Sequence, residues 1–191
     1  MMRIITGKAK GIKLETLKGD NTRPTSERAK EAVFSMLQFD IKGREVLDLF
    51  AGSGQMGLEA ISRGAASAIF VDRSKDAVAI INKNAEKTRL AQHCRIFCSD
   101  VSDYLRTVKG RRKFDIVFID PPYALRAAAS VLSQLLSSGV LKGTSIIVCE
   151  SEEADIFENS PDLIKQFEIL KMAKYGISHV TILTLKKEAK L

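Results

Sequence analysis

Four consecutive residues, Asp120-Pro121-Pro122-Tyr123, follow an apolar run from Phe114 to Ile119. The run is rich in β-branched and aromatic residues, and this composition predicts a buried strand. Both prolines lack a backbone N–H and hold φ near about −65°, so the chain must leave the sheet here. The sequence therefore predicts a carboxylate, a stiff turn and an aromatic ring at the carboxyl end of a strand, where open α/β sheets bind ligands.

This set of groups suits the exocyclic amino group of a nucleobase. The Asp120 carboxylate and the Pro121 carbonyl can accept its two N–H groups and leave the nitrogen lone pair facing outward. Tyr123 offers a flat face on which an extruded base can stack. A polar turn after a core strand is the alternative, and it would be favoured for Asp-Pro alone. The whole tetrapeptide resembles the signature of amino-group methyltransferases, so we expect the catalytic residues to be Asp120, Pro121, Pro122 and Tyr123.

A glycine turn predicts a second site earlier in the chain. The apolar run Val46–Phe50 leads into Ala51-Gly52-Ser53-Gly54, and a helical pattern follows. Gly52 and Gly54 permit backbone angles and a close approach that a Cβ would forbid. With Gly57 they fit G-x-G-x-x-G, so a nicotinamide dinucleotide and S-adenosyl-L-methionine are both candidate ligands, because each places an adenosine over such a turn.

Acidic residues near the ends of consecutive strands distinguish the two ligands. Asp72 can accept hydrogen bonds from ribose hydroxyls, Asp100 from an adenine amine, and Asp48 suits an ammonium or sulfonium charge. Each residue alone is more often a turn or cap residue. An acidic rim suits a cationic ligand better than a pyrophosphate, and this favours S-adenosyl-L-methionine. The expected cofactor contacts are Asp48, Phe50, Gly52, Gly54, Asp72 and Asp100.

Strand and helix patterns alternate after a turn at Lys42-Gly43, which indicates a mainly parallel sheet with helices on both faces. The expected strands are Glu45–Phe50, Ala68–Val71, Arg95–Cys98, Phe114–Ile119 and Ser145–Cys149, and the expected helices are Gln55–Arg63, Lys75–Arg89, Val101–Val108 and Leu125–Ser137. Two further strands, Phe167–Tyr175 and His179–Lys186, flank Gly176 and predict a closing antiparallel hairpin. The fold class is α/β and Rossmann-like, with an extension at residues 1–40 and a main domain at 41–191.

The net charge of +7 is concentrated at the N-terminus. Residues 1–30 hold eight basic and three acidic side chains, so five of the seven net charges lie there. This distribution favours a polyanionic partner, although solubility could also account for it. Residues 1–22 suit a small hairpin or a basic arm. Beyond them, Thr25 or Ser26 can cap a helix whose apolar face is Ala29, Ala32, Val33, Met36 and Leu37.

The cations in this N-terminal part are candidates for contact with nucleic acid. Arg28 and Lys30 are expected to project away from the docked face of the helix. The full set of expected substrate-binding residues is Arg3, Lys8, Lys10, Arg23, Thr25 and Arg28.

Several classes of protein are disfavoured. The N-terminus lacks the apolar core of a signal peptide, and no later run is long enough to cross a bilayer. Cys94, Cys98 and Cys149 fit no disulfide framework and have no ligand spacing with a histidine, so buried reduced thiols are expected. We expect a monomeric cytoplasmic protein without membrane contact or structural metal.

The motifs together resemble the RsmD-type family of 16S ribosomal RNA methyltransferases. The specific part is the Arg23-Pro24-Thr25 segment and the Ser62–Ala65 stretch. The other matching stretches are Arg3–Gly7, Arg28–Phe34, Leu47–Gly54, Gly57–Ala65, Asp120–Tyr123 and Lys174–Gly176. Asp72 stands where such proteins often have Glu, and residues 11–14 are less arginine-rich than the family pattern. The resemblance implies a class I methyltransferase fold, S-adenosyl-L-methionine as cofactor, and methylation of a guanine N2 amine. It implies 16S ribosomal RNA or a small ribosomal subunit particle as partner.

Other functions remain open on the residues themselves. The tetrapeptide also fits a methyltransferase of adenine N6 or cytosine N4 in DNA or another RNA, but the short chain has no evident target-recognition domain. A non-catalytic RNA-binding assembly factor with a vestigial pocket is a further alternative. The intact glycine turn and the intact tetrapeptide argue against the loss of a functional cofactor pocket.

Overall fold

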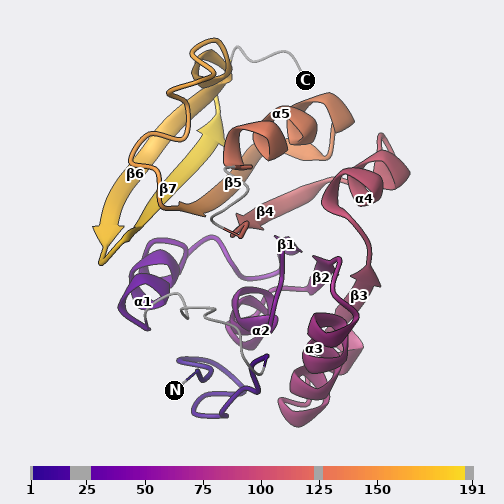
Figure 1. Cartoon of the computed structure of the whole chain (residues 1–191). Coiled ribbons are helices and arrows are strands. Elements are labelled where there is room, and N and C mark those ends of the chain that lie inside the picture. The colour runs from indigo at the N-terminus through magenta and orange to yellow at the C-terminus, as the bar shows by residue number, and fades with distance from the viewer. Residues whose placement is uncertain (1, 18–26, 123–126, 188–191) are drawn as a thin grey trace.

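Seven strands form one mixed sheet in the computed structural model, which describes residues 2–17, 27–122 and 127–187 (Figure 1). The strand order is β3-β2-β1-β4-β5-β7-β6. The first five strands in this order are parallel, and β7 runs antiparallel to both β5 and β6. The predicted parallel sheet with a closing hairpin is therefore confirmed. The strands are β1 (Glu45–Leu49), β2 (Ser67–Asp72), β3 (Cys94–Cys98), β4 (Phe114–Ile119), β5 (Leu141–Ser151), β6 (Phe167–Tyr175) and β7 (Ser178–Leu185).

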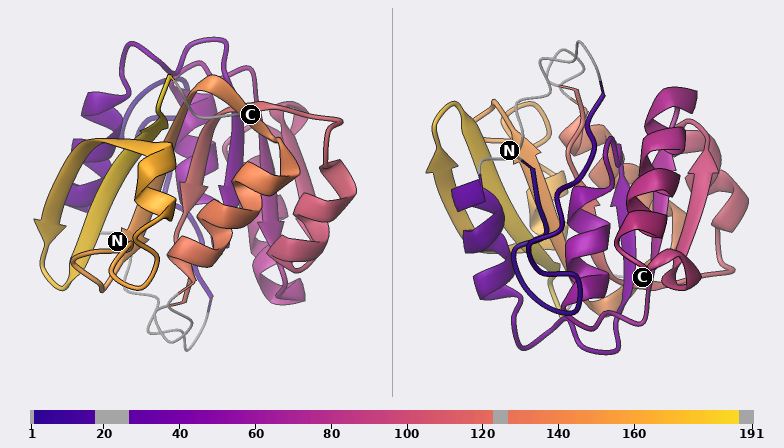
Figure 2. Two further views of the ribbon diagram at one scale, coloured as in Figure 1. Left: turned by 90° about the horizontal axis from the view of Figure 1, so that it is seen from above. Right: turned by 90° about the horizontal axis from the view of Figure 1, so that it is seen from below.

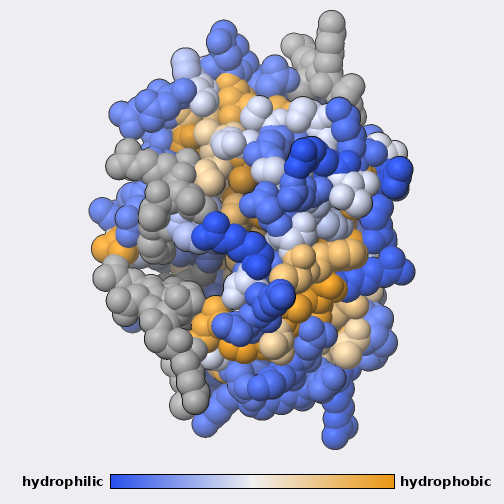
Figure 3. Space-filling view, turned by 45° about the vertical axis from the view of Figure 1, so that its right-hand side comes forward, coloured by the Kyte–Doolittle hydropathy of each residue, from blue (hydrophilic) through white to orange (hydrophobic). Residues whose placement is uncertain are grey.

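Helices cover both faces of the sheet, as Figure 2 shows from two sides. One core layer joins α1, α2 and α3 to the sheet, and the other joins α4 and α5 to the opposite face. The helices are α1 (Glu27–Met36), α2 (Gln55–Ser62), α3 (Lys75–Lys87), α4 (Val101–Val108) and α5 (Ala128–Ser138), with short 3-10 helices at Ala91–His93 and Leu163–Gln166. On the face drawn in Figure 3, hydrophilic side chains cover most of the surface. Among the described residues, no helix is long and apolar enough to cross a membrane.

The largest departure from the predicted elements is in β5, which begins at Leu141 rather than at Ser145. Leu141 pairs with Phe114, and the register then shifts before Ile116 pairs with Ile146. Such a bulge adds unpaired residues to one strand, and a period-two pattern does not reveal it. The helix predicted to begin at Leu125 is described only from Ala128.

Gly57 allows α2 to lie directly against the sheet. A Cβ at this position would lie 2.3 Å from Cε1 of Phe70 and 3.2 Å from Oδ2 of Asp48. Real Cβ atoms essentially never show contacts below 3.0 Å, so any larger residue would force either the buried Phe70 ring or the helix to move. The third glycine of the motif is therefore required by packing between helix and strand.

The N-terminal segment, residues 2–17, forms a hairpin-like turn across α2, with α1 to one side and α3 to the other (Figure 2, right). Arg3 and Lys13 form an antiparallel bridge. Ile4 is completely buried and Leu14 is nearly so, because both join the core layer of α1 and α2. Of the two possibilities raised by the sequence, the structure shows the hairpin, and we call it the N-terminal hairpin.

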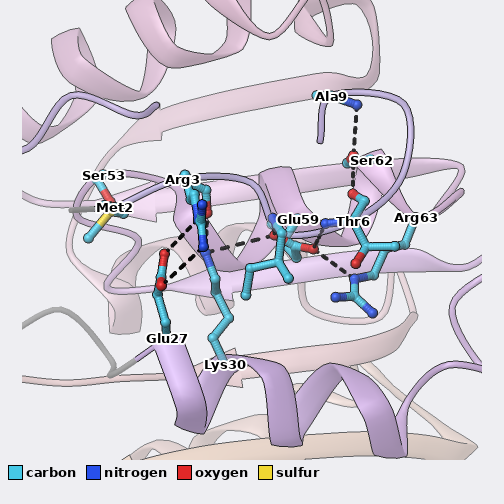
Figure 4. Close-up of polar contacts among 12 residues, drawn as sticks. Met2, Arg3, Thr6, Ala9, Glu27, Lys30, Ser53, Glu59, Ser62 and Arg63 are labelled. Carbon is cyan, nitrogen blue, oxygen red and sulfur yellow. Dashed lines mark hydrogen bonds and ion pairs between the residues drawn. The ribbon is translucent and has the colours of Figure 1, made fainter. Parts of the chain in front are cut away.

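A buried carboxylate on α2 holds this hairpin in place (Figure 4). Glu59 has no solvent exposure, and its two oxygens accept the backbone N–H groups of Ile5 at 2.7 Å and Thr6 at 3.0 Å. Arg63 Nε donates to Glu59 Oε1 at 2.8 Å, and Lys30 Nζ of α1 lies 3.8 Å from Oε2. One carboxylate thus joins the hairpin, α1 and α2.

Two sequence predictions are wrong. Lys30 does not project away from the body: its side chain is 1% exposed and donates to the Arg3 carbonyl at 2.6 Å. Burial lowers the pKa of Lys30, and the opposing attraction of Glu59 and Glu27 only partly offsets this. Cys98 is exposed rather than buried, because β3 is an edge strand. Cys149 is buried as predicted, and Cys94 is partly buried.

Replacement of Glu59 by Ala should lower the free energy of unfolding by about 3–5 kcal/mol, since Lys30 would be left as an uncompensated buried cation. Urea denaturation measures the change. Glu27→Ala is the matched control, because Glu27 pairs with Arg3 through side chains that are 41% and 55% exposed. Exposed pairs contribute at most about 1 kcal/mol. Equal losses in the two variants would contradict the role assigned to Glu59.

Candidate functional site

Acidic side chains gather at the carboxyl-terminal end of the parallel strands. Asp48 lies in β1, Asp72 ends β2, Asp120 follows β4 and Glu150 lies near the end of β5. These four strands are neighbours in the sheet and run in the same direction. Asp100 follows β3, the next strand outward. The structure therefore places every acidic residue predicted for the site at one end of the sheet.

The glycine turn lies at the same end and is strained. Phe50 has φ near 60°, a conformation that non-glycine residues rarely adopt and that clusters at ligand sites. Gly52 and Gly54 also have positive φ, at 54° and 76°. Ala51 N–H donates to the Val71 carbonyl at 3.1 Å, which ties the turn to β2. The sharp turn brings the start of α2 back over the sheet.

Asp48 stabilises the turn through a hydrogen bond with the backbone at the start of α2. Its side chain is 3% exposed, and Oδ2 accepts the Gly57 N–H at 2.9 Å. Burial raises the pKa of Asp48 to about 8; the Gly57 hydrogen bond opposes this shift, and the negative charge of Asp72 adds to it. A cation placed near Asp48 would reverse that shift, because it favours the ionised carboxylate.

Asp72 and Asp100 are already engaged by backbone groups. Asp72 accepts the N–H groups of Gly52 at 2.9 Å and Ser74 at 2.8 Å, one on each oxygen. Asp100 is exposed and caps α4 by accepting the Ser102 N–H at 2.8 Å. A carboxylate oxygen has two lone pairs, so both side chains keep acceptor capacity for a ligand. The hydrogen bonds from the backbone fix the orientation of both carboxylates.

Asp120 is the first residue after β4. Of the two prolines that follow it in the sequence, Pro121 is buried and Pro122 is exposed. Burial, together with the carboxylates of Glu150 and Asp48, raises the pKa of Asp120 well above its usual range. Tyr123, the stacking residue predicted from the sequence, lies outside the described residues. Perturbed carboxylates of this kind are typical of functional sites.

Glu150 was missed by sequence reasoning. It is 6% exposed and lies on the strand next to β4, where it contributes to the pKa of Asp120. The signal in the sequence was an acidic residue directly after the apolar run Ile146–Cys149. Its place beside Asp120 depends on strand order, which the sequence pattern does not give.

Asn84 of α3 was missed as well, and it connects the hairpin to the glycine turn. It is fully buried and donates to the carbonyls of Ser53 at 2.9 Å and Glu15 at 3.0 Å. Its side-chain oxygen accepts the Glu15 N–H at 2.8 Å. A second link is the Ser53 hydroxyl, which donates to Met2 Sδ at 2.9 Å (Figure 4). The hairpin is therefore part of the support for the turn.

The predicted substrate-binding cations lie on the surface of the N-terminal part where they are described. Lys8 and Lys10 are exposed on the hairpin, and Arg28 is exposed on α1. Arg3 is exposed and paired with Glu27 through Nε at 2.9 Å. Arg23 and Thr25 lie outside the described residues.

Comparison with known proteins assigns the family. A family model described as "Conserved hypothetical protein 95" matches residues 2–184. The chain belongs to this family, the RsmD-type methyltransferases. It is 34% identical to "Putative rRNA methyltransferase YlbH" of Bacillus subtilis over 183 residues, which cover 95% of this chain and 97% of that protein.

Two further likenesses agree. The chain is 35% identical over 151 residues to "Ribosomal RNA small subunit methyltransferase D" of Escherichia coli K12, covering 79% of this chain and 75% of that protein. A solved structure, "Putative methyltransferase yhhF from Escherichia coli", superposes with a TM-score of 0.82 at 28% identity, covering 97% of this chain and 98% of that one. The expected class I methyltransferase fold is thereby confirmed.

The raised pKa of Asp48 predicts how the stability of this RsmD-type methyltransferase depends on pH. A carboxyl group has a pKa of about 3.9 when unfolded, and that of folded Asp48 is about 8. The stability contributed by protonated Asp48 is therefore complete below about pH 4 and is lost as pH rises toward 8. One such group lowers the free energy of unfolding by at most about 1.4 kcal/mol per pH unit.

Asp48→Asn should therefore make stability fall less steeply between pH 5 and 8, while its amide oxygen still accepts the Gly57 N–H. Urea denaturation at several pH values gives the slope. Asp120 titrates in the same direction, so part of the slope should persist. A variant with the slope of the wild type would show that Asp48 is ionised throughout.

Asn84→Ala should loosen the glycine turn of this RsmD-type methyltransferase and the hairpin together, since it removes hydrogen bonds to both. Hydrogen exchange should rise at Gly52 and Gly54 and at Glu15. Asn82→Ala is the control, because Asn82 is exposed on the same helix and bonds only to Val78 among the described residues. Faster exchange at Glu15 with an unchanged turn would disprove the link.

Proposed function

We propose that the protein transfers a methyl group from S-adenosyl-L-methionine to the N2 amine of a guanine in small-subunit ribosomal RNA. The observation that carries the proposal is the position of Asp120 and Pro121 beside Asp48 and the glycine turn, at one end of the sheet. The membership of the RsmD-type family and the names of related ribosomal RNA methyltransferases support ribosomal RNA as the substrate.

The residues around the glycine turn fit this donor. S-adenosyl-L-methionine supplies a methyl group already activated by a sulfonium centre, and its ammonium group is a second cation. Asp72 is positioned to accept the ribose hydroxyls, and Asp100 the adenine amine. Asp48 and Asp120 have raised pKa values because their charges are poorly compensated. A cationic ligand relieves this repulsion, whereas a pyrophosphate would increase it.

Asp120 and the Pro121 carbonyl orient the acceptor. The guanine must leave its stack, which requires a few kcal/mol, and stacking on Tyr123 returns about 1–3 kcal/mol. Asp120 accepts one N–H of the amine and the Pro121 carbonyl accepts the other, so the nitrogen lone pair faces the methyl group. Holding the reactants in line supplies much of the rate. Asp120 need not remove a proton beforehand, because the amine becomes acidic only once it is methylated.

The exposed cations of the N-terminal part are placed to bind RNA phosphates. Lys8, Lys10 and Arg28 lie on the hairpin and on α1, which Glu59 holds together. The hairpin also supports the glycine turn through Asn84. Deletion of residues 1–20 would consequently disturb the donor site as well as RNA binding, so point substitutions at exposed cations are the better test of this role.

Asp120→Ala should lower the methylation rate about 10²–10³-fold, the usual effect of removing one preorganised polar group at a reacting centre. Affinity for S-adenosyl-L-methionine should fall far less than the rate, because the assigned adenosine contacts, Asp72 at the end of β2 and Asp100 after β3, are unchanged and only the attraction of Asp120 for the donor's positive charge is lost. Single-turnover methylation of small ribosomal subunit particles and calorimetry with the donor separate the two effects. Asp76→Ala, at an exposed position in the first turn of α3, is the control. Near-normal turnover in Asp120→Ala would show that Asp120 is only part of a turn and takes no part in the reaction.

A further inference from the structure

A concave surface lies at the amino-terminal end of the sheet, opposite the glycine turn. It is a pocket of about 630 Å³ formed where the hairpin tip meets the end of α2 and the loop between α1 and β1. Ile41 and Gly64 in its lining precede β1 and β2, so about the length of a six-residue strand, roughly 20 Å, separates it from Asp120. Its lining also includes Lys8, Gln38 and Arg63.

Three cationic side chains surround this pocket. Lys8 and Arg63 line it, and Lys42 lies close to the lining residue Gly64, since Cγ of Lys42 would be 3.8 Å from a Cβ added there. Lys8 and Lys42 are exposed and have no ion pair among the described residues. Of the neighbouring acids, Glu59 already faces Lys30 and Arg63, and Asp40 lies 3.9 Å from Arg44. The pocket is therefore positively charged.

Arg63 is held in a fixed position. Its Nε donates to Glu59, and its guanidinium lies 4.8 Å from the centre of the Phe34 ring. The side chain is 14% exposed, so its conformation is set by packing rather than by water. A preorganised guanidinium is well suited to phosphate, because its planar N–H groups match phosphate oxygens.

An exposed aromatic side chain lies in the loop that contributes to one side of the pocket. Phe39 is 89% exposed and lies in the turn after α1, directly after Gln38 and two residues before Ile41, which both line the pocket. Cations near the end of α2 could serve only to stabilise the helix C-terminus. That explanation does not account for a phenylalanine left in water. Cations in a groove next to an aromatic ring are the combination that binds single-stranded nucleic acid.

We propose that this pocket is a second RNA-binding site, which takes an unpaired segment of the RNA away from the reacting base. Lys8, Lys42 and Arg63 contact its phosphates, and a base stacks on Phe39. The choice of RNA as ligand rests on the proposed function. The exposed Lys8 and Lys10 of the hairpin belong to the same basic surface, so the RNA footprint extends along the hairpin to the amino-terminal end of the sheet.

The test uses the full chain and a transcript of 16S ribosomal RNA, with binding measured by filter retention at several salt concentrations. Phe39→Ala should weaken binding about 5- to 150-fold, the equivalent of about 1–3 kcal/mol per stacked base, and Phe39→Trp should retain it. The Lys8→Gln/Lys42→Gln double variant should reduce the slope of log affinity against log salt by about 1.4, because each lysine that neutralises a single-strand phosphate accounts for about 0.7.

Lys109→Gln/Lys113→Gln is the matched control, because both lysines are exposed at the amino-terminal end of the sheet but border β4 on the α4 side. Its salt slope should stay near that of the wild type. An equal decrease of the salt slope in both double variants would show that the slope depends only on net charge, and it would overturn the proposal. Unchanged RNA affinity in Phe39→Ala, with weakened binding to small-subunit particles, would assign the pocket to a protein partner and also overturn it.

Methylation by the wild type is measured in parallel. A wild type that binds RNA through Phe39 but transfers no methyl group would contradict the proposed function and leave the second site intact. A wild type that methylates normally, with no effect of Phe39 or of the two lysines on binding, would contradict the second site alone.

Discussion

The buried carboxylate of Glu59 is the contact on which the N-terminal half of the molecule depends. It satisfies two backbone N–H groups of the hairpin, faces Lys30 of α1 and holds Arg63 at the end of its own helix. Burial of an ionised carboxylate is costly unless partners surround it, and here three elements supply them. The same helix begins at the glycine turn. The position of the hairpin and the pocket at its tip depend on this docking, and Asn84 adds a second link between the hairpin and the glycine turn.

The two ends of β4 carry aspartates whose pKa values are shifted in opposite directions. Burial would raise the pKa of Asp115, but hydrogen bonds from Lys142, the Glu45 N–H and Arg44 hold it below its usual range. At the other end, burial and neighbouring carboxylates raise the pKa of Asp120. One carboxyl group is fully engaged by the fold, and the other is left with a charge that the fold opposes. A buried carboxylate beside other carboxylates is consistent with a site built for a cationic ligand.

Much of the fold could be predicted from the sequence, because local patterns dictate it. The apolar run Phe114–Ile119 and the two prolines after it define β4 and its end without reference to the rest of the chain. The closing hairpin could be predicted in the same way, because two strand patterns flank Gly176. The acidic residues at strand ends could be found because parallel strands bring their carboxyl ends together.

The missed residues depend on contacts between distant segments. Lys30 has the charge of a surface residue, and only the Arg3 carbonyl and Glu59 explain its burial. Asn84 looks like any polar helix residue until the hairpin and the glycine turn are placed beside it. Glu150 becomes a neighbour of Asp120 only through the strand order. Patterns with periods of 2 or 3.6 residues report which side of an element is buried, but not which partner it meets.

The most direct test of the account is the identity of the methylated nucleoside. The protein is incubated with isotopically labelled S-adenosyl-L-methionine and small ribosomal subunit particles that lack the modification, and the RNA is digested and analysed by mass spectrometry. We expect label in N2-methylguanosine, at a single position of the small-subunit RNA. Label in N6-methyladenosine or N4-methylcytidine, or no transfer to particles or to free RNA, would contradict it.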